Sequence, residues 1–281
     1  MASQATEIHA TALVDPSAKV GEGTTIGPYS IIGPNVVLGR RNKVGPHVVI
    51  EGRTTIGDEN TIFQFASVGA VPQDLKYRGE PSELRIGNGN IIRECATLQP
   101  GTKGGGMLTQ IGSNNLFMAN THVGHDSKVG DRCVIANSAA LAGHVTLGNG
   151  VIVGGLSGIH QFVRIGDIAM LGAGSMVAQD IPPYAIAQGD RATIQGLNRV
   201  GLERNGVSRE DFALLREVYR LVFMPNVSET AGKVFKDKVA FAKQRVADRQ
   251  SDVVQAFISF LEGTERGITP HHSSSSDVSA A

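Results

Sequence analysis

The sequence predicts a mainly β protein, in which a parallel β-helix of hexapeptide repeats is followed by a C-terminal α-helical domain. Aliphatic residues, and once a phenylalanine, recur at every sixth position from Ile8 to Val177, with two interruptions. Neither an alternating strand nor an α-helix has this period, which is typical of β-helix repeats. Glycine often follows the aliphatic residue, and beyond Pro182 and Pro183 helical spacing replaces the period of six.

The repeats occupy residues 1–190, in one phase from Ile8 to Leu98 and in a second phase from Ile111 onward. Three six-residue units would make a triangular coil of about 18 residues, stacked on the next coil by parallel backbone hydrogen bonds. The aliphatic side chain would point inward and fill the core. We expect Gly27 and its equivalents to occupy tight corners whose φ values other residues resist.

Two segments interrupt the repeat, at 70–85 and at 99–110. The first is dense in polar groups, and the second contains Gly104, Gly105 and Gly106. A triple glycine could cradle a phosphate, but it lacks the lysine and the helix of a phosphate loop, so a flexible loop tip is the favoured interpretation. Because loops on a rigid scaffold often carry function, both segments are candidate parts of a site.

Residues 191–265 carry the helical pattern. A capping pattern at Ser208 and the amphipathic stripe that follows it predict a helix over 208–223. Further helices are expected over 228–246 and 251–261. The segment 266–281 is rich in serine and has no apolar period, so we expect a disordered tail.

The composition fits an enzyme of modest size located in the cytoplasm. The 26 basic and 26 acidic residues cancel, which is not the charge pattern of a nucleic-acid-binding protein. No apolar run approaches the ~18 residues of a membrane span, and the N-terminus lacks the profile of a signal peptide. Cys95 and Cys133 have no metal-type spacing, so we expect reduced thiols that are at least half-buried.

Four histidines gather on one edge of the predicted prism. Counted in steps of about 18 residues, His122, His125, His144 and His160 fall on or beside one corner in neighbouring coils. Gln161 shares the position of His125 two coils later. A single corner histidine is most simply a tolerated surface residue, but four in one strip favour a site.

His125 could act as a general base, and Asp126 could be the group that orients it. Neighbours on a strand point to opposite sides, whereas at a corner they can converge. The backbone N–H of Gly143, one coil above His125, is a candidate oxyanion donor. A base and an oxyanion hole without a protein nucleophile indicate direct acyl transfer to a hydroxyl group.

These residues lie in motifs that resemble one family, the cytoplasmic acyl-[acyl carrier protein]:UDP-N-acetylglucosamine O-acyltransferases. The resemblance covers about His9 to Gly263 and rests on QDLKY, on HxxHD around His125 and on VAQDIPPYAIAQGDRA. It implies a left-handed β-helix and a homotrimer with active sites between neighbouring prisms. It also implies transfer of a 3-hydroxyacyl group to the 3-hydroxyl of UDP-N-acetylglucosamine, the first step of lipid A biosynthesis. The donor would be an acyl-phosphopantetheine on acyl carrier protein, with no cofactor and no metal.

The resemblance also implies roles for individual residues. His125 would be the general base, Asp126 its orienting group and Gly143 the oxyanion donor. The substrate-binding positions would be Asp74, Lys76, His122, His144, His160, Gln161, Asn198 and Arg204. The acyl-chain groove would include Met170 and Ala173, and because Ala173 is small we expect a medium or long 3-hydroxyacyl donor.

The chain departs from the residues that we take as typical of the family at Gln99-Pro100, Val200 and Asn205. An acidic carrier protein would also need a basic surface near the site. The candidate residues for this surface are Arg209, Arg216, Arg220, Lys233, Lys236 and Lys238. The same residues would equally suit a solvated helix face.

Three other functions fit part of the pattern. A γ-type carbonic anhydrase shares the prism and clustered histidines but needs three zinc-ligating histidines that are shared across subunits and leave an open metal position. Related hexapeptide N-acyltransferases, which use a 3-amino sugar nucleotide or a coenzyme A donor, are nearer alternatives, and QDLKY favours the O-acyltransferase over them. A non-catalytic scaffold would leave the histidine strip unexplained.

Overall fold

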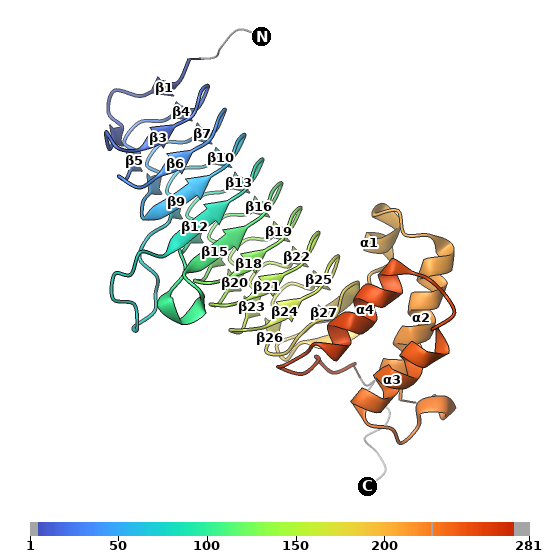
Figure 1. The fold of residues 1–281 in the computed structure, drawn as a ribbon. Helices are drawn as coiled ribbons and strands as arrows, with labels where there is room; N and C mark the ends of the chain where they lie inside the picture. The colour runs from blue at the N-terminus through green and yellow to red at the C-terminus, as the bar shows by residue number, and fades with distance from the viewer. Residues whose placement is uncertain (1–4, 226, 273–281) are drawn as a thin grey trace.

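The computed structural model describes residues 5–225 and 227–272. The chain forms a long three-sided prism, and a group of helices packs at its C-terminal end (Figure 1). Successive coils pair in parallel register with a step of 18 residues wherever no loop intervenes, except at the last coil, where Met170 pairs with Ile186. The three sheets of the prism are called the first, second and third face below.

The first face is an 11-stranded sheet whose last two strands form an antiparallel hairpin. Its strands are β1 (Glu7–Ile8), β4 (Thr25–Ile26), β7 (Lys43–Val44), β10 (Thr61–Ile62), β13 (Ile91–Ile92), β16 (Leu116–Phe117), β19 (Val134–Ile135), β22 (Ile152–Val153), β25 (Met170–Leu171), β27 (Ala185–Gln188) and β28 (Thr193–Leu197).

The second face has nine strands and the third has eight. The second comprises β2 (Leu13–Val14), β5 (Ile31–Ile32), β8 (Val49–Ile50), β11 (Ser67–Val68), β14 (Thr97–Leu98), β17 (His122–Val123), β20 (Ala140–Leu141), β23 (Gly158–Ile159) and β26 (Met176–Val177). The third comprises β3 (Lys19–Val20), β6 (Val37–Leu38), β9 (Arg53–Ile56), β12 (Glu83–Ile86), β15 (Leu108–Ile111), β18 (Lys128–Val129), β21 (Thr146–Leu147) and β24 (Arg164–Ile165).

The sixth-position side chains fill the prism, as the period predicts. Ile50, Leu98 and Leu141 are completely buried. Ile8 is 47% exposed, because among the described residues a coil stacks on only one side of it. The core therefore begins with the second coil.

The glycines that follow the core side chains have a different purpose from the one expected. Positive φ at the corners is carried mainly by other residues, such as Tyr29 (58°) and Arg132 (55°), and Gly27 is not among the positive-φ glycines. A Cβ on Gly27 would instead lie 2.8 Å from the carbonyl carbon of Gly45. Glycine is required there because adjacent coils approach too closely for a side chain.

Buried asparagines form a second ladder inside the prism. The N–H of Asn90 donates to Asn60 Oδ1 at 2.8 Å, and the N–H of Asn115 donates to Asn90 Oδ1 at 2.9 Å. Cys133 is the next residue of this ladder, because its N–H donates to Asn115 Oδ1. Burial raises the pKa of the Cys133 thiol to about 11. Cys95 is exposed at a corner, so the expectation of a half-buried thiol is wrong for that residue.

The helical region contains α1 (Arg199–Arg204), α2 (Arg209–Phe223), α3 (Phe235–Arg245), α4 (Asp252–Glu262) and the 3-10 turn η2 (Ser228–Thr230). The predicted cap of α2 is confirmed, since Ser208 Oγ accepts the Asp211 N–H at 2.9 Å. Helix α3 is shorter than expected because η2 forms a separate turn. Within the described part of the chain, no helix is long and apolar enough to cross a membrane.

The expectation of a disordered tail from residue 266 onward is wrong for its first part. Asp180 donates its N–H to the carbonyl of Gly267 at 2.9 Å, and Ile194 donates to that of Pro270 at 2.8 Å. Backbone groups can complete a sheet whatever side chains they carry, so the absence of an apolar period does not prevent order. The rest of the predicted tail, residues 273–281, lies outside the described residues.

Candidate active site

A histidine and a carboxylate converge at the corner that follows β17. Asp126 has a φ of 60°, which turns the chain at the corner. His125 Nδ1 consequently lies 2.8 Å from Asp126 Oδ2, and both residues are buried. Because the carboxylate accepts the Nδ1–H, the lone pair of the neutral imidazole is placed on Nε2.

The interruption at 99–110 holds the carboxylate in place. The Thr102 N–H donates to both oxygens of Asp126, at 2.9 and 3.0 Å, and its hydroxyl donates to Oδ2 at 2.6 Å. A Cβ on Gly105 would overlap this carboxylate. Of the triple glycine, Gly105 is thus packed against the site, in a short 3-10 turn η1 (Lys103–Gly105), whereas Gly104 and Gly106 are exposed. Sequence reasoning missed Thr102 because nothing in the local pattern links it to Asp126.

Gly143 lies directly against the imidazole of His125. A Cβ at this position would be 2.6 Å from His125 Nε2, so a larger residue would displace the ring. The Gly143 carbonyl accepts the N–H of Phe162 at 3.3 Å. Among the residues that the structure describes, no acceptor takes the N–H of Gly143. This N–H is available to a ligand next to the histidine.

Two further histidines surround the pair. The ring of His144 is edge-on to His125, with centroids 5.1 Å apart, and stacks on Phe162 at 4.3 Å. Burial lowers the pKa of His144 despite the opposing effect of the nearby carboxylate. His122 Nδ1 lies 2.7 Å from Thr97 Oγ1, and burial, together with the charge of His125, lowers its pKa. Both imidazoles therefore favour the neutral form.

Three of these residues are of types that can bind a metal ion. Ligand atoms of His125, Asp126 and His144 lie within 4.8 Å of one another. However, Asp126 Oδ2 already accepts hydrogen bonds from His125 and Thr102, and His144 Nε2 remains 4.0 Å away. A hydrogen-bonded dyad describes the arrangement better.

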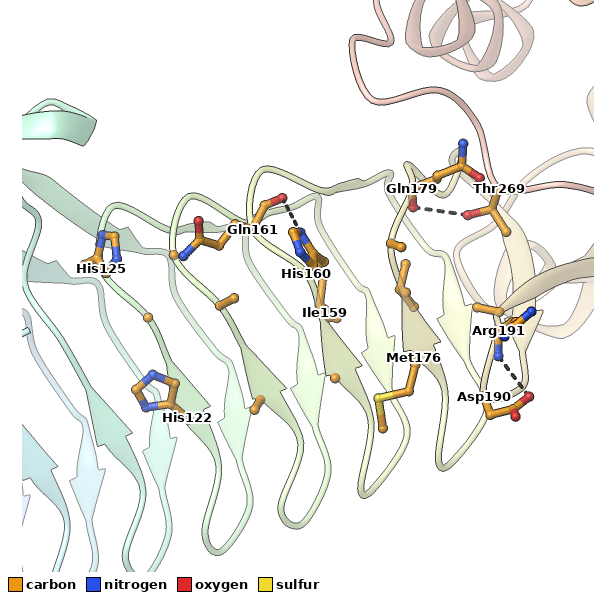
Figure 2. Close-up of a pocket in the computed structure, with 18 of the residues that line it drawn as sticks. His122, His125, Ile159, His160, Gln161, Met176, Gln179, Asp190, Arg191 and Thr269 are labelled. Atoms are coloured by element: carbon orange, nitrogen blue, oxygen red, sulfur yellow. Dashed lines mark hydrogen bonds between the residues drawn. The ribbon is translucent and has the colours of Figure 1, made fainter. Parts of the chain in front are cut away.

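A groove with a volume of about 850 Å³ follows the second face from these histidines to the C-terminal end of the prism (Figure 2). It brings together five predicted site residues: His122, His125, Gly143, His160 and Gln161. Its floor is formed by small or apolar residues, namely Ala140, Ala142, Gly158, Ile159, Met176, Val177 and Ala178. Its far end is lined by Gln179, Asp190, Arg191, Ala192, Thr193, Thr269 and Pro270.

Sequence reasoning missed every residue at this far end. Gln179 continues the repeat and could have been placed by counting. Asp190 to Thr193 belong to the β27–β28 hairpin, and Thr269 and Pro270 come from the segment that was expected to be disordered. No periodic signal connects those residues to the repeat.

The predicted residues of the first interruption lie close to the histidines. Asp74 is half-buried and Lys76 is exposed. Asp74 Oδ1 accepts the N–H of Lys76 at 2.9 Å. The charge of Asp74 raises the pKa of His144, and the charge of Lys76 lowers it. Gln99, one of the departures from the family pattern, ties this segment to the groove by accepting the Gln73 N–H at 3.2 Å.

Eight predicted residues do not line the groove of their own chain. Asp74, Lys76, Asp126 and His144 lie next to its histidine end, whereas Asn198, Arg204, Met170 and Ala173 lie away from it. Asn198 caps α1, since Oδ1 accepts the Gly201 N–H at 2.9 Å, and its Nδ2 donates to the Ile168 carbonyl at 2.8 Å. Arg204 is exposed at the end of the same helix. Met170 is exposed on the first face, and Ala173 is exposed at the corner that follows it.

Stacked hexapeptide coils and a histidine–carboxylate dyad beside a groove define a hexapeptide-repeat transferase. In agreement, a family model described as bacterial transferase hexapeptide (six repeats) matches residues 5–40 and 108–143, and one described as UDP N-acetylglucosamine O-acyltransferase, domain 2, matches residues 180–269. The chain belongs to the acyl-[acyl-carrier-protein]–UDP-N-acetylglucosamine O-acyltransferase family. The Aliarcobacter butzleri protein of that name is 50% identical over 93% of this chain and 97% of its own length.

Solved structures agree with this assignment. The UDP-N-acetylglucosamine O-acyltransferase of Moraxella catarrhalis is 41% identical, with a TM-score of 0.87 over 93% of this chain and 99% of its own. The Francisella novicida UDP-N-acetylglucosamine acyltransferase is 34% identical, with a TM-score of 0.89 over 98% of both chains. The prism is therefore the left-handed β-helix of this family, with its C-terminal helical domain.

Proposed function

We propose that this enzyme transfers a 3-hydroxyacyl group from acyl carrier protein to the 3-hydroxyl of UDP-N-acetylglucosamine, the first step of lipid A biosynthesis. The observation that carries the proposal is the His125–Asp126 dyad, with Gly143 against its imidazole, at one end of a groove with an apolar floor. Membership of the family supports the choice of substrates. We also propose that the reaction takes place in the cytoplasm.

In the proposed reaction His125 is the general base. Its Nε2 takes the proton of the sugar hydroxyl while the oxygen attacks the thioester carbonyl. The oxyanion that forms accepts a hydrogen bond from the backbone N–H of Gly143. When the carbon–sulfur bond breaks, the imidazolium returns its proton to the departing thiolate. Asp126 keeps the imidazole in the required tautomer and stabilises its positive charge.

The remaining histidines suit the nucleotide sugar. His122 and His144 flank the dyad, and His160 and Gln161 follow along the groove. We propose that these polar groups, with Asp74 and Lys76 at the first interruption, bind the sugar and its diphosphate. The neutral imidazoles of His122 and His144 can both donate and accept hydrogen bonds there.

We also propose a homotrimer in which the first face of one chain packs on the second face of the next. Outward side chains on the first face include Ile91 and Ile152, and those on the second include Leu13 and Ile31, all partly or largely exposed in one chain. The third face instead presents charges, such as Lys128. Exposed apolar surface on two faces only indicates that those faces are covered.

The corner between these two faces would lie near the three-fold axis. An aromatic column runs along this corner, with His47 stacked between Tyr29 at 5.2 Å and Phe65 at 5.4 Å. Tyr29 is 60% exposed and Phe65 is 58% exposed. Three such columns facing one another would bury this surface, which gains roughly 25 cal/mol per Å² of apolar area.

A trimer of this kind also accounts for the residues that lie away from the groove. Met170 and Ala173 border the first face, and Asn198 and Arg204 belong to the helix next to it. When a neighbour's first face covers the second face, these residues approach the groove of the adjacent chain. We propose that they complete the nucleotide and acyl-chain contacts from there.

Acyl carrier protein would dock on the helical domain. Arg216 and Arg220 are exposed on α2 and border a second cavity of about 680 Å³. The cavity is also lined by the rings of Tyr219 and Phe212 and by Glu217, and Arg220 forms an ion pair with Glu229 at 3.4 Å. An arginine pair beside an apolar hollow suits an acidic helical partner, because charge steers the encounter and apolar contact stabilises it.

The proposal is tested by incubating the chain with UDP-N-acetylglucosamine and a series of 3-hydroxyacyl carrier proteins. The 3-amino analogue of the sugar nucleotide and coenzyme A thioesters form the parallel arms. We expect an ester product that His125→Ala reduces by at least about 10²-fold, while His9→Ala, a change far from the groove, has no effect. Preference for the amino analogue or for coenzyme A would instead identify a related N-acyltransferase.

A further inference from the structure

The two interruptions of the repeat project from the prism side by side (Figure 1). The first interruption carries Asp74 and Lys76, which are assigned above to the nucleotide sugar. The second carries Thr102, which holds the Asp126 carboxylate of the dyad. The contacts that join the two interruptions therefore also join the sugar-binding residues to the general base.

Glu80 joins the interruptions through both oxygens of its carboxylate. Oε2 accepts the N–H of Arg78, in the first interruption, at 2.7 Å, and Oε1 accepts the N–H of Lys103, in the second, at 3.1 Å. These hydrogen bonds lower the pKa of Glu80, so its carboxylate is ionised at neutral pH. An ionised carboxylate can only accept hydrogen bonds, and here it accepts one from each interruption.

On one side, Glu80 closes a compact turn of residues 74–80. Tyr77 donates its N–H to the Asp74 carbonyl and its hydroxyl to the Glu80 carbonyl, both at 3.0 Å. Lys76 donates its N–H to Asp74 Oδ1 at 2.9 Å. Because these bonds connect Asp74 with Glu80, the position of Glu80 affects that of both sugar-binding residues.

On the other side, the hydrogen bond from Lys103 fixes the residue that holds the dyad. The Lys103 N–H belongs to the same planar peptide group as the Thr102 carbonyl. Thr102 is 3% exposed and makes three hydrogen bonds to Asp126. A peptide group held by Glu80 therefore also orients the donors to Asp126, which in turn orients His125.

A second contact fixes the beginning of the same turn. Gln99 is 5% exposed, and its Oε1 accepts the N–H of Gln73 at 3.2 Å. The turn is thus attached to the second interruption at both ends, by Gln99 at its beginning and by Glu80 at its end. Of these two contacts, the one at Glu80 lies next to Thr102.

We propose that Glu80 is a positioning residue, which holds the 74–80 turn and the His125–Asp126 dyad as one unit. This inference rests on the proposed function, since it takes Asp74 and Lys76 as sugar-binding residues and His125 as the general base. Glu80 acts through Arg78 and Lys103 and does not touch the substrate. Without its carboxylate, both the turn and the donors to Asp126 would be held less firmly.

Two substitutions at Glu80 and one control test the proposal. Glu80→Ala removes both acceptor oxygens. Glu80→Gln has nearly the same volume and keeps one acceptor oxygen. Glu83→Ala is the matched control, because it removes a carboxylate three residues away that pairs with Arg85 at 2.6 Å.

The measurement is kcat and KM for UDP-N-acetylglucosamine at a saturating concentration of acyl carrier protein. We expect Glu80→Ala to raise KM by about fivefold and to lower kcat by about tenfold, because small displacements of reacting groups are costly. Glu80→Gln should give intermediate values, and Glu83→Ala should give normal ones.

A double variant separates positioning from a general loss of structure. In Asp126→Ala the carboxylate that Thr102 holds is absent, so Glu80 has no catalytic group to position. Adding Glu80→Ala to this variant should change kcat by less than about twofold. It should still raise KM, because the 74–80 turn remains dependent on Glu80. General loss of structure would lower kcat equally with and without Asp126.

The outcomes distinguish this inference from the proposed function. If the unaltered enzyme transfers no acyl group to the nucleotide sugar, the proposed function fails. If it is active, the inference is overturned when Glu80→Ala, shown by circular dichroism to be folded, keeps the normal kcat. It is also overturned when Glu80→Ala lowers kcat equally in both backgrounds. Should Glu80→Ala fail to fold, the same comparison with Glu80→Gln decides.

Discussion

His125 Nδ1 lies 2.8 Å from Asp126 Oδ2 although the two residues are adjacent in the sequence. Adjacent side chains on a strand point to opposite faces, so this contact requires the corner. The φ of 60° at Asp126 supplies it. The geometry that makes the prism triangular thus also forms the dyad.

The dyad predicts that Asp126→Asn lowers kcat by about 10²- to 10⁴-fold, because the amide no longer fixes the tautomer or stabilises the imidazolium. Steady-state kinetics with the purified protein would measure this. The double variant with His125→Ala should be no slower than His125→Ala alone, since the two residues act as a unit. Additive losses would show that Asp126 acts independently of the histidine.

The packing of η1 predicts opposite results for two neighbouring glycines. A Cβ on Gly105 would overlap the Asp126 carboxylate, whereas one on Gly104 would be 3.9 Å from its nearest neighbour, Thr102 Oγ1. Gly105→Ala should therefore lower kcat by about tenfold or more through displacement of the carboxylate. Gly104→Ala should retain normal kcat, and equal losses in both would contradict the assigned packing.

The aromatic corner column predicts the oligomeric state of a charged variant. Phe65→Glu would place three carboxylates near the proposed three-fold axis, where they repel one another and lose water. Light scattering after gel filtration should show a trimer for the unaltered chain and smaller species for the variant. Thr55→Glu, exposed on the third face, is the control and should remain trimeric.

The lowered pKa of His122 predicts a pH dependence of stability. Burial holds its pKa below the ordinary value of 6.5 in the folded chain. As the pH falls through that value, His122 binds a proton in the unfolded chain but not yet in the folded chain. The free energy of unfolding therefore decreases. In His122→Asn this contribution is absent, and stability should fall less between about pH 7 and pH 5. Urea unfolding at several pH values measures the difference.

Much of the fold could be predicted from local spacing. The period of six placed Ile50 and Leu141 in the core, and the capping pattern at Ser208 marked the start of α2. Counting by coils also placed His125, Gly143 and Gln161 along one groove. These features depend on the register of the backbone, which repeats and can therefore be counted.

Other parts of the site were decided only by the tertiary structure. Thr102 reaches Asp126 from an interruption of the repeat, and Thr269 reaches the groove from a segment without any period. The glycines after the core residues are explained by the close approach of the next coil rather than by φ. Such contacts form between segments whose separation follows no rule in the sequence.

The sequence by itself determined the prism, its corners and the edge that carries the histidines, because each coil repeats the hydrogen bonds of the one before. Only the tertiary structure showed that Asp126 is held by Thr102 and that the groove ends at Thr269. It also showed that Met170 and Asn198 lie away from their own chain's groove. These relations depend on how loops and the C-terminus close in three dimensions, which a local repeat does not encode.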